Sequence, residues 1–536
     1  MQLTFIGADH EVTGSCHFLE IGDTKLTVDC GMEQGADIYE NAELPVAASD
    51  IDIVLLTHAH IDHSGYLPLL YSHGFRGTIY STKATADLCQ IMLRDSAHIQ
   101  EMEAEWKNRK AKRSGLPEVQ PLYSIQDAEN VIKHFKPLDY DTIVEIAEGI
   151  KIRFSDVGHL LGSASIEIWA TEQNKTVKLA FSGDIGNVNQ PLIRDPQFLS
   201  EADYVIMEST YGDRSHGGTP DYVAELTRII RDTFGKGGNV VIPSFAVGRT
   251  QELLYFIREI KTQNLLPEYP DFEVYVDSPL AVEATNIFNR NVESRFDETA
   301  KELVRQGINP ISFPGLKTSV TSDDSKAINF NPEPKVIISA SGMCEAGRIR
   351  HHLKHNLWRP ECTILFVGYQ ANGTLGRALI EGTQSVTLFG ETIDVEAKIE
   401  QLIGISGHAD KEHLIEWVEA FSPKPKKVFV VHGEDSVCES FARCLNEEHG
   451  FQAVAPYTGS IYDFTEDAFI TEGNTVKKER KVTVNFRSPR AAAIYQRLIA
   501  AGQRLMTVIR HNEGGTNKDL SKFTDQINAL CDKWDR

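Results

Sequence analysis

Three features common in exported and membrane proteins are missing from this 536-residue sequence. It has no apolar run long enough to cross a bilayer. Its N-terminus has no basic start followed by an apolar stretch, so no secretory signal is visible. Its eight cysteines form no C-x-x-C pair, which favours reduced thiols. These absences predict a cytoplasmic protein without a membrane partner.

Basic residues are also few, because the sequence has 54 Lys and Arg against 76 Asp and Glu, which gives a net charge of −22. This balance argues against general adhesion to nucleic acid or to anionic lipid. It does not exclude a nucleic-acid substrate, because only the charge that lines a cleft acts at short range.

The order of apolar runs divides the chain into four parts. Residues 1–211 contain short β-branched runs, interrupted by one expected helix at about 84–112. Residues 212–383 alternate helix and strand, which predicts parallel strands with crossover helices, and 314–334 is expected to be a surface excursion. The strand-rich pattern returns in 384–465, so the second part is expected to be an inserted domain. Residues 466–536 form a C-terminal extension of unknown role.

The stretch "LLTHAHIDHSG" (55–65) contains His58, His60, Asp62 and His63 directly after an apolar run. The end of the strand fixes the backbone, and the turn lets the four side chains converge. Imidazoles and a carboxylate without cysteine favour zinc or a similar borderline divalent ion. The alternative is a polar turn that caps a helix.

Further candidate ligands follow apolar strands elsewhere in the chain. His159 lies in "SDVGHLLGSAS", Asp184 in "LAFSGDIGN" and His432 in "FVVHGE". A single histidine is more often a packed core residue than a ligand. The shared position beside glycine at a strand end makes the group of three more informative than any one member.

H-x-H-x-D-H with these downstream residues resembles the metallo-β-lactamase fold superfamily. The resemblance implies an α/β fold, an αβ/βα four-layer sandwich with metals at one edge. Asp29 in "LTVDCG" matches the first motif of that family and is expected to support the ligand loops. The implied ligand sets share Asp184: His58, His60 and His159 on one side, and Asp62, His63 and His432 on the other.

Three further motifs narrow the resemblance to the β-CASP nucleases. "ESTYGDR" (208–214), "SGHAD" (406–410) and "VVHGE" (430–434) supply Glu208, His408 and His432 in the order of that family. The inserted domain would then be a β-CASP domain with a parallel sheet. Histidine at the third motif is the choice of RNA-directed members, such as the RNase J group and the polyadenylation-factor endonucleases.

The resemblance implies a ribonuclease with two Zn²⁺ ions, Mn²⁺ being the alternative metal. A hydroxide that bridges the metals would attack the phosphodiester and leave 5′-phosphate and 3′-hydroxyl ends. Asp62 and Asp184 would belong to this catalytic centre. His408 would protonate the leaving oxygen, tuned by Glu208. The implied substrate is single-stranded RNA, and relatives of this kind are commonly homodimers.

"SASGMCEAGRIRHH" reads as a strand that passes through a turn into a helix, and backbone N–H groups in such a turn can bind phosphate. The candidate substrate contacts are Ser339, Ser341, Gly342 and Arg348, with Arg249 in "PSFAVGRTQE" as a fifth. The alternative is an ordinary turn with a surface arginine.

Two other functions stay open on the sequence. The metal site would also suit a hydrolase of a small thioester, lactone or phosphodiester. A catalytically silent RNA-processing subunit is the third reading, although every ligand residue is present. We find no N-terminal RNA-binding module, and the tail is shorter than the C-terminal domain typical of RNase J. The balance between internal cleavage and 5′ exonuclease activity is therefore open.

Overall fold

The computed structural model describes residues 1–34, 38–114, 118–217, 220–371, 373–402, 404, 406–478, 505, 508–509 and 517–534. The chain divides into two compact units, Met1–Lys478 and Glu479–Arg536. The second unit contains helix α16 (Asn517–Trp534). Most of the remaining C-terminal extension (466–536) lies outside the described residues.

The first unit begins with an eight-stranded sheet of order β23-β22-β1-β2-β3-β4-β5-β6. The strands β3 to β6 pair in parallel, whereas β1 pairs antiparallel with both β2 and β22. The strands are β1 (Gln2–Gly7), β2 (Cys16–Ile21), β3 (Thr24–Val28), β4 (Ile53–Leu55), β5 (Thr78–Thr82), β6 (Phe135–Leu138), β22 (Ile461–Asp463) and β23 (Ala468–Thr471).

A seven-stranded sheet of order β21-β20-β11-β10-β9-β8-β7 packs against the first. Its strands β10, β11 and β20 are parallel neighbours, although more than 200 residues of sequence separate β11 from β20. The strands are β7 (Val144–Ala147), β8 (Ile150–Asp156), β9 (Ala164–Glu172), β10 (Lys175–Phe181), β11 (Tyr204–Glu208), β20 (Lys427–Val431) and β21 (Ala453–Val454).

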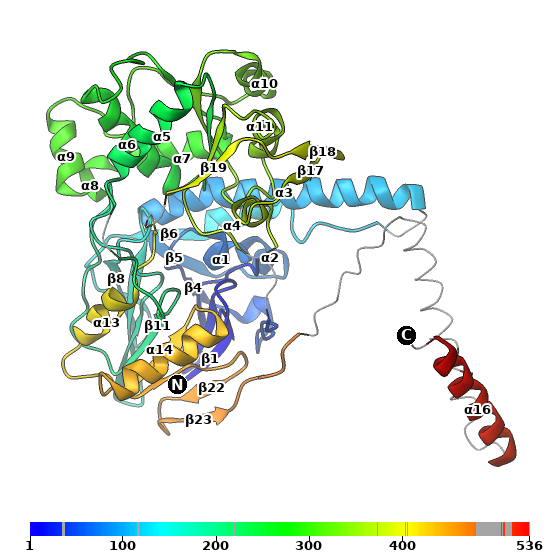
Figure 1. Cartoon of the computed structure of the whole chain (residues 1–536). Helices are drawn as coiled ribbons and strands as arrows, with labels where there is room; N and C mark the ends of the chain where they lie inside the picture. Colours follow the sequence, from blue (N-terminus) through cyan, green and yellow to red (C-terminus); the bar gives the residue numbers. More distant parts are fainter. Residues whose placement is uncertain are drawn as a thin grey trace. The chain divides into compact units, whose positions relative to one another are not determined.

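Helices cover the outer face of each sheet, which confirms the αβ/βα sandwich (Figure 1). Between the sheets, side chains such as Phe5, Phe154 and Phe429 form a continuous apolar core. The helices are α1 (Ile61–Ser64), α2 (Leu67–Ser72), α3 (Lys83–Ser114) and α4 (Ile125–Val131) on the first sheet, and α13 (Lys411–Glu419) and α14 (Asp435–Glu447) on the second.

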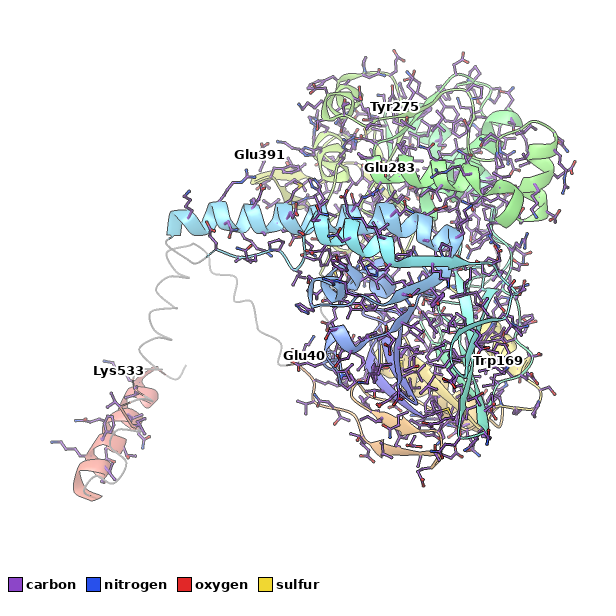
Figure 2. All side chains as sticks on the ribbon, turned by 180° about the vertical axis from the view of Figure 1, so that it is seen from behind. Glu40, Trp169, Tyr275, Glu283, Glu391 and Lys533 are labelled. Carbon is purple, nitrogen blue, oxygen red and sulfur yellow. The ribbon has the colours of Figure 1, made fainter. Side chains whose placement is uncertain are left out.

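Helix α3 matches the helix expected at about 84–112 and extends it by a few residues. Its buried residues Leu88 and Leu93 belong to the core that also contains residues of the inserted helices. In the view from behind, Glu283 of helix α7 (Pro279–Arg290) lies beside α3 (Figure 2). Across the described part of the chain, no helix, α3 included, combines the length and apolar character that a membrane span requires.

The inserted region is built on a six-stranded sheet of order β14-β13-β15-β12-β16-β19 in which every pairing is parallel. This confirms the expected parallel type. The strands are β12 (Val240–Pro243), β13 (Glu273–Val276), β14 (Leu316–Thr318), β15 (Lys335–Ser339), β16 (Thr363–Phe366) and β19 (Lys398–Gln401). The remaining helices are α5 (Tyr222–Phe234), α6 (Arg249–Thr262), α8 (Val292–Arg295), α9 (Glu298–Arg305), α10 (Ser322–Phe330), α11 (Ile349–Asn356) and α12 (Leu375–Ile380).

Two segments near this sheet differ in detail from the expected division of the chain. The segment 314–334 is not only a surface excursion, because it contains the edge strand β14 and helix α10. Beyond residue 383 the chain forms the hairpin of β17 (Ser385–Leu388) and β18 (Glu391–Asp394), with Glu391 marked in Figure 2. It then returns to the inserted sheet as β19. The domain boundaries stay predictions, and β19 places the end of the insert nearer to residue 402.

Candidate metal centre

The candidate ligands all follow strands that end at the same edge of the sandwich. His58 lies three residues after β4, and His60, Asp62 and His63 occupy the start of α1. The other ligands lie just after strands of the second sheet. They are His159 after β8, Asp184 after β10 and His432 after β20. Parallel strand ends meet at one edge, so ligands more than 370 residues apart in sequence come together.

The first donor group contains His58, His60, His159 and Asp184, whose ligand atoms all lie within 4.8 Å of one another. His60 Nδ1 lies 3.1 Å from both His58 Nε2 and His159 Nε2. Asp184 Oδ2 lies 3.5 Å from the same two Nε2 atoms. Four donor atoms therefore face one point.

The second donor group contains Asp62, His63 and His432. His63 Nε2 lies 3.1 Å from His432 Nε2, and His432 Nε2 lies 3.8 Å from Asp62 Oδ2. The other oxygen of Asp184, Oδ1, lies 3.2 Å from His63 Nε2 and 3.6 Å from His432 Nε2. Asp184 thus points one oxygen at each group, as expected of a carboxylate shared between two sites.

Both groups fit a divalent cation. A tetrahedral ion with bonds of 2.0–2.1 Å has ligand atoms about 3.3 Å apart, close to the distances observed. Asp184 Oδ1 is buried, and its only near contacts among the described residues are the imidazoles of His63 and His432, with no other hydrogen-bond donor; a buried carboxylate oxygen placed in this way favours a bound cation. Imidazole and carboxylate donors without thiolate suit zinc and similar borderline ions.

Hydrogen bonds from outside the two groups set the orientation of the imidazoles. His63 Nδ1 donates to Asp29 Oδ2 at 2.7 Å, and His159 Nδ1 donates to the Gly407 carbonyl at 2.9 Å. Each bond leaves Nε2 to face the cluster. His58 Nδ1 contacts the Thr57 hydroxyl at 3.1 Å, and His432 Nδ1 contacts the Thr210 hydroxyl at 3.2 Å. Sequence reasoning identified Asp29 but missed both threonines, although Thr57 and Thr210 lie inside quoted motifs.

Burial shapes the protonation of the first donor group. Desolvation lowers the pKa of His58, His60 and His159 below the ordinary histidine value, despite the nearby Asp184. These rings are therefore neutral near pH 7, which is the form that binds a metal.

Glu208 and His408 form a pair beside the first donor group. His408 Nδ1 lies 3.2 Å from both carboxylate oxygens of Glu208 and 3.9 Å from Asp184 Oδ2. Glu208 is buried and also accepts the Ile185 N–H at 2.5 Å. Burial alone would lower the pKa of His408, but the Glu208 carboxylate, with Asp184 and Asp62, raises it to about 9. His408 can therefore carry a proton next to the cluster.

Of the five expected substrate contacts, Ser339 and Arg348 have their side chains bound within the inserted domain, whereas Arg249 lines a cavity. Ser339 is buried and donates its hydroxyl to the Asp277 carbonyl at 2.8 Å, and Arg348 forms an ion pair with Asp277 at 2.7 Å. Both side chains are therefore engaged within the inserted domain. Ser341 and Gly342 lie in the turn that follows β15.

Arg249 begins helix α6, pairs with Glu252 and lines a cavity of about 560 Å³ between the inserted segment and the loops that lead to His408. Sequence reasoning also missed Asp277, which holds Arg348 and accepts from His352 Nε2 at 2.6 Å.

Three family models match the sequence. They are described as metallo-beta-lactamase superfamily domain (18–183), Beta-Casp domain (250–379) and Zn-dependent metallo-hydrolase RNA specificity domain (392–456). A relative named Ribonuclease TTHA0252, from Thermus thermophilus, is 36% identical over 83% of this chain and 96% of its own length. The chain belongs to the β-CASP family of the metallo-β-lactamase superfamily.

Archaeal β-CASP proteins are also similar to this one. Transcription termination factor FttA of Methanocaldococcus jannaschii is 32% identical over 85% of this chain and 70% of its own length. The FttA of Methanosarcina mazei is 31% identical over 82% of this chain and 68% of its own length. These similarities confirm the β-CASP resemblance and the fold class inferred from the motifs.

Proposed function

We propose that this β-CASP protein is a zinc-dependent ribonuclease that hydrolyses phosphodiester bonds and leaves 5′-phosphate and 3′-hydroxyl ends. The observation that carries this proposal is the contact of the His408–Glu208 pair with Asp184, the carboxylate common to both donor groups. The match of 392–456 to an RNA specificity domain and the similarity to a protein named as a ribonuclease support it.

Two Zn²⁺ ions are the proposed cofactors, one in each donor group, with Mn²⁺ as the alternative. When bound, such ions polarise a phosphate and activate a water molecule. The chain contributes the positioning of these ions through Asp184, which reaches both groups. Asp29 and the Gly407 carbonyl contribute by holding the imidazoles of His63 and His159 in place.

His408 is the proposed general acid for the leaving 3′ oxygen. Its Nδ1–H donates to Glu208, so the proton on Nε2 is the one available for transfer. Glu208 stabilises the protonated ring, and nearby cations would oppose this and bring the pKa closer to neutrality. A proton donor with a pKa near the working pH transfers most effectively.

The competing function is hydrolysis of a small thioester, lactone or phosphodiester by the same cluster. The His408–Glu208 pair and the RNA specificity match favour RNA over these substrates. A catalytically silent subunit is disfavoured because all seven donor residues are present and converge.

The decisive experiment is incubation of the purified protein with single-stranded RNA after measurement of zinc per chain. We expect about two zinc ions and cleavage that Asp184→Ala abolishes. RNA that stays intact while a small ester is hydrolysed would refute the ribonuclease. RNA with a 5′-monophosphate or a 5′-triphosphate then separates internal cutting from stepwise 5′ digestion by product length.

The role of His408 has a matched control in the same region. His408→Ala should slow cleavage by about 10²- to 10⁴-fold while it retains the metal. His413 is also paired with a carboxylate, Asp410, at 2.6 Å, but it lies outside both donor groups. His413→Ala should therefore cleave nearly as fast as the unmodified protein. Loss of zinc from His408→Ala would contradict the assignment as an acid.

Single-stranded RNA as the preferred substrate, a cytoplasmic location and a homodimer complete the proposal. Light scattering of the purified chain tests the dimer. Comparison of cleavage of one RNA sequence, free and annealed to its complement, tests the preference for single strands.

A further inference from the structure

Two large aromatic side chains are exposed at one edge of the inserted sheet. The turn "SASGM" (339–343) lies at the same edge. Phe245 follows β12 and Tyr369 follows β16, and each is 49% exposed. The strands β15, β12 and β16 are parallel neighbours. The three loops that follow them therefore meet at the carboxyl edge of the sheet, where ligands of open parallel sheets bind.

Gly342 contacts both of the loops that carry these rings. A Cβ added at Gly342 would lie 3.2 Å from a ring carbon of Phe245, so the ring packs against this glycine. On the other side, Gln370, the neighbour of Tyr369, donates its amide to the Gly342 carbonyl at 3.1 Å. The loops that carry the two exposed rings thus meet at Gly342.

The loop of Phe245 also contacts the loop that contains the candidate ligand His159. A Cβ added at Gly248 would lie 3.1 Å from Leu160, the residue that follows the donor His159. The loop 244–248 therefore stands directly against the loop that supplies one of the metal-facing imidazoles. A base held on Phe245 would belong to a nucleotide close to the cluster.

The backbone beneath each ring is fixed although the ring is exposed. The Phe245 carbonyl accepts the Thr250 hydroxyl at 2.7 Å, and the Tyr369 carbonyl accepts the Gln370 amide at 3.1 Å. Rings on a rigid backbone lose little freedom when a ligand stacks on them. A single exposed aromatic side chain is common on protein surfaces, but two exposed rings on anchored backbone at a ligand-binding edge need a reason.

Local charge also suits an anionic ligand. In a chain with a net charge of −22, the loops 244–248 and 367–371 contain neither Asp nor Glu, and the loop after β15 (340–348) contains one acidic residue, Glu345, whose carboxylate accepts the Leu375 N–H. Beyond about 8–10 Å, solvent ions screen the acidic surface elsewhere. A phosphodiester backbone can therefore approach the two loops that carry Phe245 and Tyr369 without facing a carboxylate from them.

We propose that Phe245 and Tyr369 are stacking platforms for unpaired bases of the RNA substrate next to the cleaved bond. This role rests on the proposed ribonuclease function and gives it a physical basis for single-strand preference. Every base offers a π-face to an aromatic ring, so stacking tolerates many sequences but requires a base that is free of its duplex.

Substitutions at Phe245 separate stacking from packing. By the usual strength of base–aromatic stacking, Phe245→Ala should weaken binding of a fluorescent single-stranded RNA by about 5- to 150-fold. Phe245→Trp should bind as the unmodified protein does, and Phe245→Leu should behave like Phe245→Ala. Tyr369→Ala and Tyr369→Phe form the second pair. Phe330→Ala is the control, because Phe330 is 78% exposed and ends α10, outside the three loops.

RNA with one abasic ribose, moved along the strand, provides the decisive readout. At one position the abasic substitution should weaken binding to the unmodified protein but not to Phe245→Ala, because the same contact is already missing. Full binding by Phe245→Leu, or an abasic penalty that is the same in every variant at every position, would overturn the proposal. Binding is measured without turnover, so a protein that binds RNA in this way but does not cleave it would contradict only the ribonuclease.

Discussion

Asp29→Asn tests how strongly the second donor group depends on a residue outside it. Asp29 Oδ2 accepts from His63 Nδ1, and Oδ1 accepts the Thr57 N–H at 2.9 Å and the Thr57 hydroxyl at 3.0 Å. A carboxylate accepts with both oxygens, whereas the amide of asparagine has one acceptor and one donor. Asparagine therefore leaves either His63 or the Thr57 N–H facing a donor.

The size of the effect follows from the bond that is lost. A hydrogen bond to a charged group contributes about 1.5–3 kcal/mol, and about 1.4 kcal/mol corresponds to a tenfold change in affinity. We therefore expect roughly 10- to 100-fold weaker metal binding in the second donor group, the usual effect of losing a carboxylate behind a metal-bound histidine. The first donor group should keep most of its affinity, because among the described residues Asp29 makes no hydrogen bond or ion pair with any of its imidazoles.

Dialysis against increasing chelator, followed by elemental analysis of zinc per chain, measures both sites at once. Asp29→Asn should release one ion at much lower chelator than the second, so that a plateau at one zinc per chain appears. Asp52→Asn is the control, because the exposed Asp52 carboxylate lies away from both donor groups and accepts the Lys25 N–H at 2.9 Å. Release of both ions by Asp29→Asn at the chelator level of the unmodified protein would refute the reasoning.

Three other variants probe the fold around the site. Gly31→Ala should lower stability by about 3 kcal/mol or more, because its Cβ would lie 1.7 Å from the Asp62 carbonyl. Thermal melting checks this against Gly368→Ala, because a Cβ at Gly368 meets nothing within 4 Å and its φ is not positive. Asp277→Asn should cost about 3 kcal/mol in urea unfolding, since it leaves Arg348 and His352 without their carboxylate. Burial opposes ionisation of Asp277, but His352, Ser325 and Arg348 lower its pKa from 3.8 to about 2. The stabilisation by the ionised Asp277 is therefore present above pH 3.8 and is lost as the pH falls from 3.8 to about 2. Burial lowers the pKa of Lys335 from 10.5 to about 8. Between these pH values the unfolded chain keeps a proton that the folded chain has released, so the free energy of unfolding should rise with pH. Lys335→Met should remove this rise.

The fold class and the convergence of the candidate donor residues could be predicted because both leave local signals in the sequence. His58, His60, Asp62 and His63 lie within six positions, and each remaining ligand follows an apolar strand. The alternation of helix and strand in the insert signals a parallel sheet. These patterns can be recognised without knowing which segments are in contact in the folded protein.

Long-range pairing could not be predicted in the same way. Arg348 was expected to contact phosphate, yet Asp277, 71 residues earlier, binds its guanidinium in the folded protein. Nothing near Arg348 in sequence announces this partner. Strand β14 was missed for a similar reason, since "LKT" is a short edge strand between polar residues, and only its pairing with β13 identifies it.

The position of the insert follows from the order of strands in the second sheet. Strands β11 and β20 are parallel neighbours in a register that sets Glu208 opposite Val431, so Glu208 and His432 lie one residue apart across the sheet. Parallel neighbours require a crossover connection, and the inserted domain is part of that connection. Because it leaves β11 at the carboxyl edge, where the donor residues also lie, it begins beside the metal centre and not at the opposite edge. Its surface loops can therefore vary in what they recognise while the strand ends that position the donors stay the same.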